Sequence, residues 1–195
     1  MADQQLARQM FKHFNKFMLF NWRLGMGPYL SFWPYGFGRY LVLIHTGRKT
    51  GLTRRTPVNY APIDGDFYVT AGWGTKAHWY RNIMAGPHIE GGAPDGRWLA
   101  EAEDISDEEG STAIMREVLK NSGFASFAAG INPHRIRDED LAAATTDYRL
   151  LRLRPTAAAS GPDGPGDLVW VWPVTVLVLL AGLLVGRRPR PAQRS

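Results

Sequence analysis

The middle of the chain, from residue 39 to residue 153, consists of short apolar or β-branched runs that alternate with turns rich in Gly, Pro and Asp. Runs of this length bounded by turn residues are typical of β-strands, whereas an amphipathic helix needs a longer stretch with helical periodicity. We therefore predict an α+β domain around a small closed sheet. The predicted strands are Arg39–Thr46, Arg54–Pro62, Phe67–Ala71, His88–Glu90, Arg97–Asp104 and Tyr148–Leu153.

Two helices are predicted inside this domain. The first covers Ala77–Ala85 and ends at Gly86-Pro87, a pair that does not continue a helix. The second begins at Ser106, because a glutamate follows three residues later and the two form a capping box. It is expected to reach about Asn121. No Gly-x-Gly-x-x-Gly turn joins a strand to a helix, which argues against a Rossmann domain.

The N-terminal part of the chain, residues 1–37, is predicted to be distinct from the sheet domain. Residues 3–20 carry apolar and basic side chains at helical spacing, which predicts an amphipathic helix. Two interpretations stay open: the helix lies on a membrane surface, or it packs on its own domain. Residues 22–37 are aromatic and interrupted by Gly and Pro, so we expect an irregular segment able to cover a pocket. The apolar face of the predicted helix contains Leu6, Met10, Phe11, Phe14, Phe17 and Met18.

The C-terminal part of the chain contains an uncharged run, residues 168–186, which follows a predicted flexible linker at residues 155–167. A run of this length predicts a transmembrane helix, with two tryptophans at its start and a basic tail at residues 187–195. We expect a single-pass membrane protein. The basic tail and the lack of a signal peptide favour opposite orientations, so the topology stays open, with a cytoplasmic catalytic domain preferred.

The charge of the chain is unevenly distributed. Residues 1–55 hold nine Lys or Arg and one acidic residue, whereas residues 56–167 are net acidic and residues 168–195 hold only arginines as charged residues. A basic, aromatic start indicates an anionic surface or ligand as partner. No nucleic-acid-binding motif accompanies it, so no nucleic-acid partner is expected. The absence of cysteine excludes disulfides, thiolate metal sites and cysteine nucleophiles.

The first candidate site is the segment from Gly47 to Pro57, which holds four cations and three hydroxyl groups. A turn bounded by glycines can offer backbone N–H groups to an anion, and Arg and Lys add charge-assisted hydrogen bonds. The composition fits either a phosphate- or carboxylate-bearing ligand or a solvated basic hairpin. The spacing of a Walker loop is absent.

The second candidate site is the glycine-rich segment from Thr70 to Tyr80, where a predicted strand leads into a helix. Glycines allow a ligand to approach the backbone closely, and a helix N-terminus favours anions. Trp73 and Trp79 could flank a planar ring or simply belong to the core. Both segments border neighbouring strands, so we expect them to face one site. The five histidines are scattered and no nucleophile elbow is present, which leaves no metal site and favours chemistry supplied by a cofactor.

Residues 40–154 resemble the deazaflavin-dependent nitroreductase family. The most specific parts are the Thr-Gly-Arg-Lys-Thr-Gly turn at residues 46–51 with Arg-Thr-Pro after it, and Trp-Tyr-Arg-Asn at residues 79–82 followed by Gly-Pro. The resemblance implies a split β-barrel over residues 38–154, binding of coenzyme F420 and hydride transfer from the reduced deazaflavin. An electron-poor acceptor, a quinone or a nitroaromatic compound, would receive the hydride.

The resemblance also implies roles for individual residues. Arg48, Lys49 and Arg54 match positions that hold the phosphate and acidic tail of the cofactor. Independently of the resemblance, either Tyr60 or a water molecule is the candidate proton donor. Thr56 and Pro57 match the strand beneath the ring, Ala71–Gly74 match a loop on its phosphate side, and Trp79 matches an aromatic residue near the ring. The full cofactor-binding set is Gly47, Arg48, Lys49, Thr50, Arg54, Thr56, Pro57, Ala71, Gly72, Trp73, Gly74 and Trp79.

Two alternatives to this function stay open at the level of sequence. The same barrel could bind FMN, because fold alone does not determine function. The protein could also be a membrane-attached carrier of the cofactor or of a hydrophobic ligand, without enzymatic activity. A homodimer is compatible with the sequence. A lipid-soluble quinone as acceptor would suit the two apolar ends of the chain.

Overall fold

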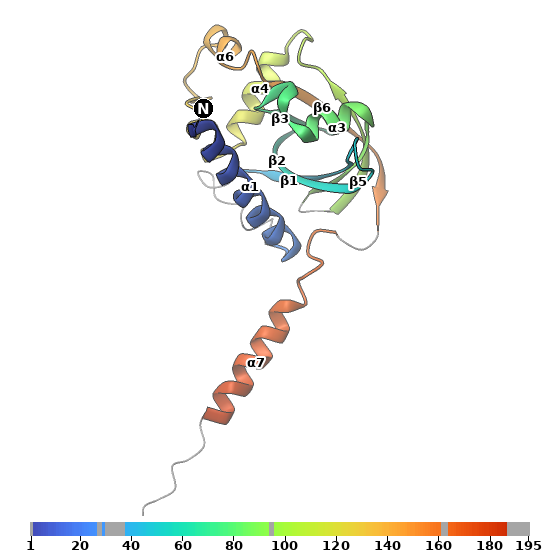
Figure 1. Ribbon diagram of the computed structural model, residues 1–195, viewed down its shortest axis with the longest axis vertical. Helices are drawn as coiled ribbons and strands as arrows, with labels where there is room; N and C mark the ends of the chain where they lie inside the picture. Colours follow the sequence, from blue (N-terminus) through green and yellow to red (C-terminus); the bar gives the residue numbers. More distant parts are fainter. Residues whose placement is uncertain (1, 27–28, 30–37, 94–95, 161–163, 187–195) are drawn as a thin grey trace, which may run out of the picture.

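The computed structural model describes residues 2–26, 29, 38–93, 96–160 and 164–186. Six antiparallel strands form a closed barrel in the order β1-β2-β3-β6-β5-β4, with helices around it (Figure 1). The prediction of an α+β fold with a six-stranded barrel is confirmed. The strands are β1 Tyr40–Thr46, β2 Thr53–Ile63, β3 Asp66–Ala71, β4 His88–Ala93, β5 Gly96–Asp104 and β6 Arg149–Ala159.

Strand β1 is buried on both of its faces. Its first six residues are buried, since alternate side chains point to the barrel interior and to an outer layer covered by a helix. Leu41 and Leu43 belong to the interior cluster, while Val42 and Ile44 belong to the cluster under helix α1. A strand covered on both faces needs a continuous apolar run, which this sequence provides.

Helix α1, Ala2–Arg23, packs on its own domain, one of the two interpretations left open by the sequence. Met18 and Trp22 are buried against the outer face of β1, and the Trp22 indole Nε1 donates to the Gly92 carbonyl oxygen at 3.1 Å. A Cβ on Gly92 would lie 2.4 Å from the indole, so this position needs glycine. Phe17, which lies on the predicted apolar face, is about half exposed. Most of the irregular segment predicted at residues 22–37 lies outside the described residues.

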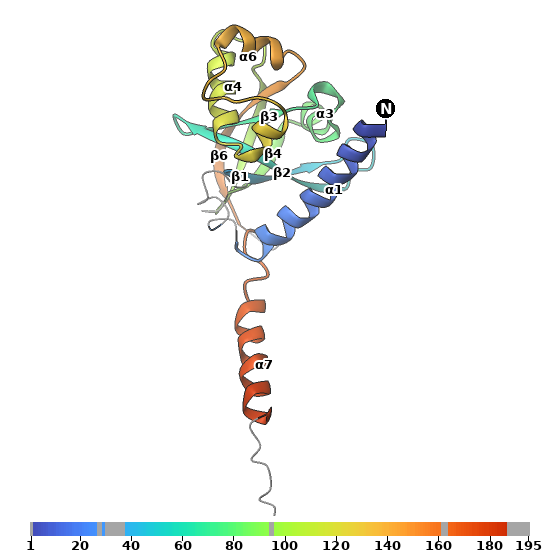
Figure 2. The same ribbon diagram turned by 90° about the vertical axis from the view of Figure 1, so that its left-hand side faces the viewer.

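Helix α4, Ser111–Lys120, covers another side of the barrel, together with α5 Phe124–Ala128 and α6 Asp138–Ala144 (Figure 2). The predicted capping box at residues 106–109 is wrong. The Ser106 hydroxyl is bonded to Asp104 Oδ1 at 2.5 Å and accepts from the Leu150 N–H at 2.8 Å, so it joins β5 to β6. The helix begins five residues later, after Gly110 with a φ of +82°.

Strand β6 continues to Ala159, so the predicted linker at residues 155–167 begins too early. The extra residues are ordered by pairing with β5, as far as Arg97 opposite Ala159. After it, the chain returns to the end of α1: Leu168 N–H donates to the Arg23 carbonyl oxygen at 2.8 Å, and Asp167 pairs with the Arg23 guanidinium at 2.9 Å.

Helix α7, Val171–Gly186, extends away from the barrel (Figure 1). None of the helices, as far as the structure describes the chain, combines the length and apolar character needed to cross a membrane. The transmembrane helix predicted over residues 168–186 is therefore not confirmed. The helix has 16 residues, about 24 Å, because residues 165–170 form turns that are bonded to the end of α1.

Candidate functional site

Both predicted segments lie at the same end of the barrel, which we call the α3 end. Strand β1 ends and β2 begins at the turn of residues 47–52, whereas β3, which is antiparallel to β2, ends at Ala71, level with Val58 in the middle of β2. The 3₁₀-helix η1, Gly74–Lys76, and helix α3, His78–Ala85, follow β3. Tyr80 and Ile83 of α3 are buried in the barrel core, so this helix covers the α3 end.

The turn at residues 47–52 is tightly bonded within itself. The Gly47 N–H donates to the Leu52 carbonyl oxygen at 2.8 Å, and the Thr50 and Gly51 N–H groups donate to the Gly47 carbonyl oxygen. Gly51 has a φ of +66°, a conformation that favours glycine. The N–H groups of Gly47, Thr50 and Gly51 are therefore already used, and the Arg48 N–H faces Asn82 Oδ1 at 3.3 Å, so few backbone donors of this turn remain for the predicted anion site.

The cationic side chains of this region differ in exposure. Lys49 and Arg54 are exposed, whereas Arg48 is half-buried. Arg48 Nη1 donates to Asn82 Oδ1 at 2.9 Å and lies 3.5 Å from the His78 carbonyl oxygen. The turn is thus attached to α3 through one guanidinium, while two further cations face solvent beside it.

A buried histidine continues this attachment into the barrel. His45 is 4% exposed; its Nδ1 lies 3.4 Å from Asn82 Nδ2, and its Nε2 lies 3.2 Å from Thr56 Oγ1. Burial lowers the pKa of His45, and the nearby Arg54 charge lowers it further, against a backbone hydrogen bond at Thr46 that raises it. The sequence indicated only a packing histidine here, and Asn82 only as part of a motif. The sequence feature that could have identified His45 is a histidine inside an otherwise apolar predicted strand.

The neutral state of His45 predicts a pH dependence of stability. As the pH falls below about 6.5, the unfolded chain protonates this histidine before the folded chain does, so the free energy of unfolding decreases until the pH reaches the lowered pKa. In His45→Gln, denaturant titrations at several pH values should lack this component. His88→Gln, at an exposed position, should keep it. Equal pH dependence in the wild type and His45→Gln would contradict the assignment.

The glycine-rich loop is shaped by packing. Gly74 has a φ of +52°, and a Cβ there would lie 1.9 Å from the Asp147 carbonyl oxygen, so glycine is required by the neighbouring chain segment. Trp79 packs half-buried against the barrel core, and Trp73 is 41% exposed. Of the two tryptophans that could flank a planar ring or belong to the core, Trp79 therefore contacts the core.

A second hydrogen-bonded pair fixes α3 to the barrel wall. The Tyr80 hydroxyl donates to Asp104 Oδ2 at 2.5 Å. Burial and this carboxylate raise the pKa of Tyr80 to about 12. Partial burial would raise the pKa of Asp104, but hydrogen bonds from Ser106 and Tyr80 outweigh it and hold that pKa below its ordinary value. Tyr80 thus stays protonated at neutral pH and holds the helix at this end.

Tyr60 lies toward the other end of the barrel. It follows Arg54 by six residues of β2, which is about 20 Å along a strand. Its ring is tilted against Phe67 at 5.5 Å between centroids, and Phe67 stacks on Trp98 at 4.6 Å. A shallow hollow of about 470 Å³ opens here, and a smaller one of about 290 Å³ lies near Pro87. The larger hollow is lined by Phe67, Gly96, Arg97, Trp98, Pro155, Thr156, Ala157 and Ala158.

The structure thus groups the predicted residues into two sets. The turn at residues 47–52 contacts α3 through Arg48, and the loop at residues 72–76 contacts the same helix through the Thr75 carbonyl oxygen, which accepts from Arg81. Tyr60 lies farther along β2 than Arg54, with two other aromatic residues. Thr56 and Pro57 lie between, on β2. Within the described residues, no group of three or more His, Asp or Glu side chains could hold a metal ion.

Comparison with known protein families gives a match over this region. The sequence model of a protein family described as F420H(2)-dependent quinone reductase matches residues 33–136, more than half of the chain. No curated protein sequence matches the chain.

Several solved structures are similar at low sequence identity. An F420-H2-dependent reductase is 16% identical, with 59% of this chain and 93% of that chain covered and a TM-score of 0.43. An F420 reductase is 19% identical, with 67% and 94% covered and a TM-score of 0.43. A heme storage protein from Vibrio cholerae is 15% identical, with 61% and 82% covered and a TM-score of 0.43.

Proposed function

Because the chain belongs to the F420H(2)-dependent quinone reductase family, and is therefore an oxidoreductase that uses coenzyme F420, we propose that the cationic turn at the α3 end holds the cofactor's acidic tail. The observation that carries this proposal is the position of Lys49 and Arg54. Both are exposed beside a turn whose backbone is fixed by its own hydrogen bonds and by Arg48. A fixed turn presents these charges without further ordering of its backbone.

The side chains of this turn suit the chemistry of an anionic group. Guanidinium groups bind phosphate and carboxylate with several N–H donors in one plane, and an ammonium group adds a mobile point charge. The turn has both kinds within seven residues, Arg48 and Arg54 with Lys49 between them. No acidic side chain lies in this segment to neutralise them. The donor set therefore fits the tail of the cofactor.

This placement assigns different roles in the reaction to the cofactor and to the protein chain. The bound deazaflavin supplies the hydride chemistry. The chain binds the tail at one end of β2 and supports the ring along Thr56 and Pro57, which matches the implied position of the ring. A quinone that accepts a hydride needs one proton to become a hydroquinone, and Tyr60 or a water molecule would donate it.

The proposed function is tested with purified full-length protein. Titration with F420 and with FMN, followed by absorbance, should show preferential binding of F420. When a quinone is added to the protein with reduced F420, the reduced F420 should be oxidised faster than in the same mixture without protein. Tight binding of F420 without turnover across quinones and nitroaromatic compounds would support a carrier and contradict the reductase.

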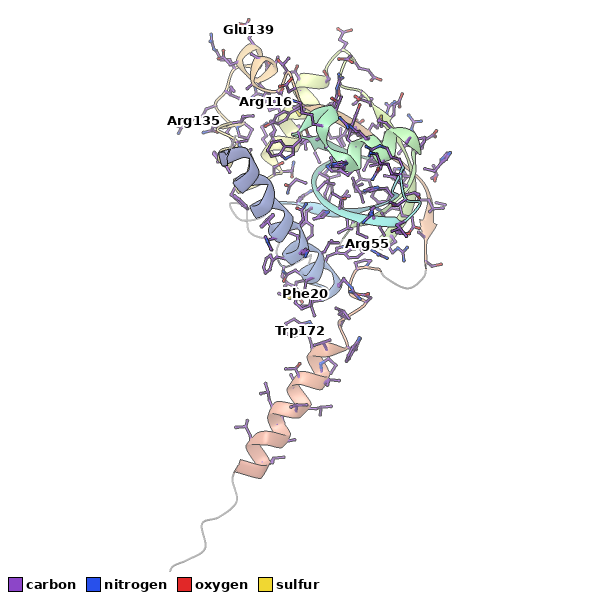
Figure 3. All side chains as sticks on the ribbon, viewed as in Figure 1. Phe20, Arg55, Arg116, Arg135, Glu139 and Trp172 are labelled. Carbon is purple, nitrogen blue, oxygen red and sulfur yellow. The ribbon has the colours of Figure 1, made fainter. Side chains whose placement is uncertain are left out.

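Helix α7 supports a further proposal about the acceptor, namely that this helix contacts a lipid bilayer from which a quinone reaches the site. Its leucines are 51–65% exposed from Leu177 to Leu183, and the exposed rings of Phe20 and Trp172 lie at the junction between α1 and α7 (Figure 3). Tryptophan favours the headgroup level, and the arginines that follow in the sequence complement anionic lipids. The proposal is that α7 contacts lipid, and it does not require the helix to cross the bilayer.

Flotation with anionic liposomes tests this contact. Full-length protein should float with the liposomes, and a variant with Leu177→Glu and Leu183→Glu should remain in solution. A matched variant with two exposed leucines outside α7 changed, Leu52→Glu and Leu99→Glu, should float like the wild type. Wild-type protein that does not float, or that self-associates through α7 instead, would contradict the proposal.

A further inference from the structure

Asn82 is the residue through which the turn, the helix and the barrel are joined. Its Oδ1 accepts from Arg48 Nη1 at 2.9 Å and lies 3.3 Å from the Arg48 backbone nitrogen. Its Nδ2 lies 3.4 Å from His45 Nδ1, and His45 Nε2 lies 3.2 Å from Thr56 Oγ1. One amide side chain thus links α3 to β1, and through His45 to β2.

The donors and acceptors along this chain agree with one another. Arg48 can only donate, so the amide oxygen of Asn82 faces it and the amide nitrogen faces His45. The His45 Nδ1 must then accept, which leaves the proton on Nε2 to be donated to the Thr56 hydroxyl oxygen. This arrangement requires a neutral imidazole, and burial of the ring favours that state. The contacts among these four residues therefore have consistent donor and acceptor roles.

We propose that Asn82 is a positioning residue that holds Arg48 in place for the anionic tail of F420. The proposal rests on the proposed function of the turn. A long arginine side chain that is free in solution loses rotamer freedom when it binds a ligand, and this loss weakens binding. Contacts at two points of the same residue, its backbone N–H and its guanidinium, remove that freedom beforehand. Asn82 itself need not touch the cofactor.

The test measures F420 binding and catalysis separately. Asn82→Ala should raise the dissociation constant of F420 about tenfold and raise KM for reduced F420 by a similar factor, while kcat should change little. Met84→Ala, at a partly exposed position on the same helix, should leave both unchanged. A residue with only a structural role would lower the melting temperature and kcat together. Unchanged F420 affinity in a folded Asn82→Ala protein would overturn the proposal.

A double-mutant cycle with Arg48 sharpens the test. If Asn82 acts through Arg48, then Asn82→Ala should have no further effect on F420 affinity once Arg48 is alanine. An equal effect in both backgrounds would overturn the proposal. If the proposed function of the turn were wrong, replacing Lys49 and Arg54 would also leave F420 affinity unchanged, which separates the two failures.

A second variant keeps the proposal testable if Asn82→Ala does not fold. Asn82→Asp retains an oxygen acceptor for Arg48 but places a negative charge beside its guanidinium. F420 affinity should fall at least as far as in the alanine variant, and the loss should shrink at high salt, since added ions screen exposed charges. Wild-type affinity in Asn82→Asp would overturn the proposal.

Discussion

Replacing Lys49 and Arg54 together by alanine is expected to weaken F420 binding about 100-fold. A hydrogen bond to a charged group contributes about 1.5–3 kcal/mol, and about 1.4 kcal/mol corresponds to a tenfold change in affinity, so each exposed cation should account for about tenfold or more. The dissociation constant follows from titration of the cofactor's absorbance. The loss should be larger at low than at high ionic strength.

The control for this prediction is a cation of similar type away from the turn. Lys120 lies on α4, where it pairs with Glu117 at 2.8 Å. Lys120→Ala changes the net charge as each single replacement does, and it should leave F420 affinity unchanged. If Lys120→Ala and the double variant weakened binding equally, the general positive charge of the protein, and not the turn, would hold the tail.

Replacing Trp22 by alanine is expected to lower the free energy of unfolding by about 3–5 kcal/mol. The indole is 1% exposed, fills the space over Gly92 and donates a hydrogen bond to its carbonyl oxygen. Its removal creates a cavity and leaves that oxygen without this donor. Chemical denaturation measures the change. Phe20→Ala, at a position 55% exposed on the same helix, should change stability by no more than about 0.5 kcal/mol.

A small effect of Trp22→Ala would contradict the docking of α1 on the barrel. The same helix could then be available for another surface, which was the other interpretation of its amphipathic sequence. A large effect that is confined to Trp22 and absent at Phe20 would establish that α1 is part of the folded domain.

The strands of the barrel could be predicted because their signals are local. Turn residues and short apolar runs placed β1 and β3 within one residue of their observed bounds. The second half of β6 could not be predicted in this way, since the sequence after Arg154 resembles a linker and is a strand only because β5 pairs with it. Helices α5 and α6 have five and seven residues, too few to give a periodic pattern.

The residues of the candidate site could be predicted from the sequence, but the hydrogen bonds that join them could not. Charge density singled out the turn, and the neighbouring strands indicated that the loop after β3 would lie near it. The link between Arg48, Asn82 and His45 joins residues 34 and 37 positions apart, and no local pattern reveals such a contact. The hydrogen bonds that occupy the Gly47, Thr50 and Gly51 N–H groups of the turn could not be predicted from the sequence either.

The most direct test of the account compares F420 with a deazaflavin that lacks the phosphate and acidic tail. Wild-type protein should bind F420 about 100-fold more tightly than the truncated compound, and the Lys49→Ala, Arg54→Ala double variant should bind both with similar affinity. This result would show that the turn recognises the tail. Equal preference for F420 in the wild type and in the double variant would contradict it.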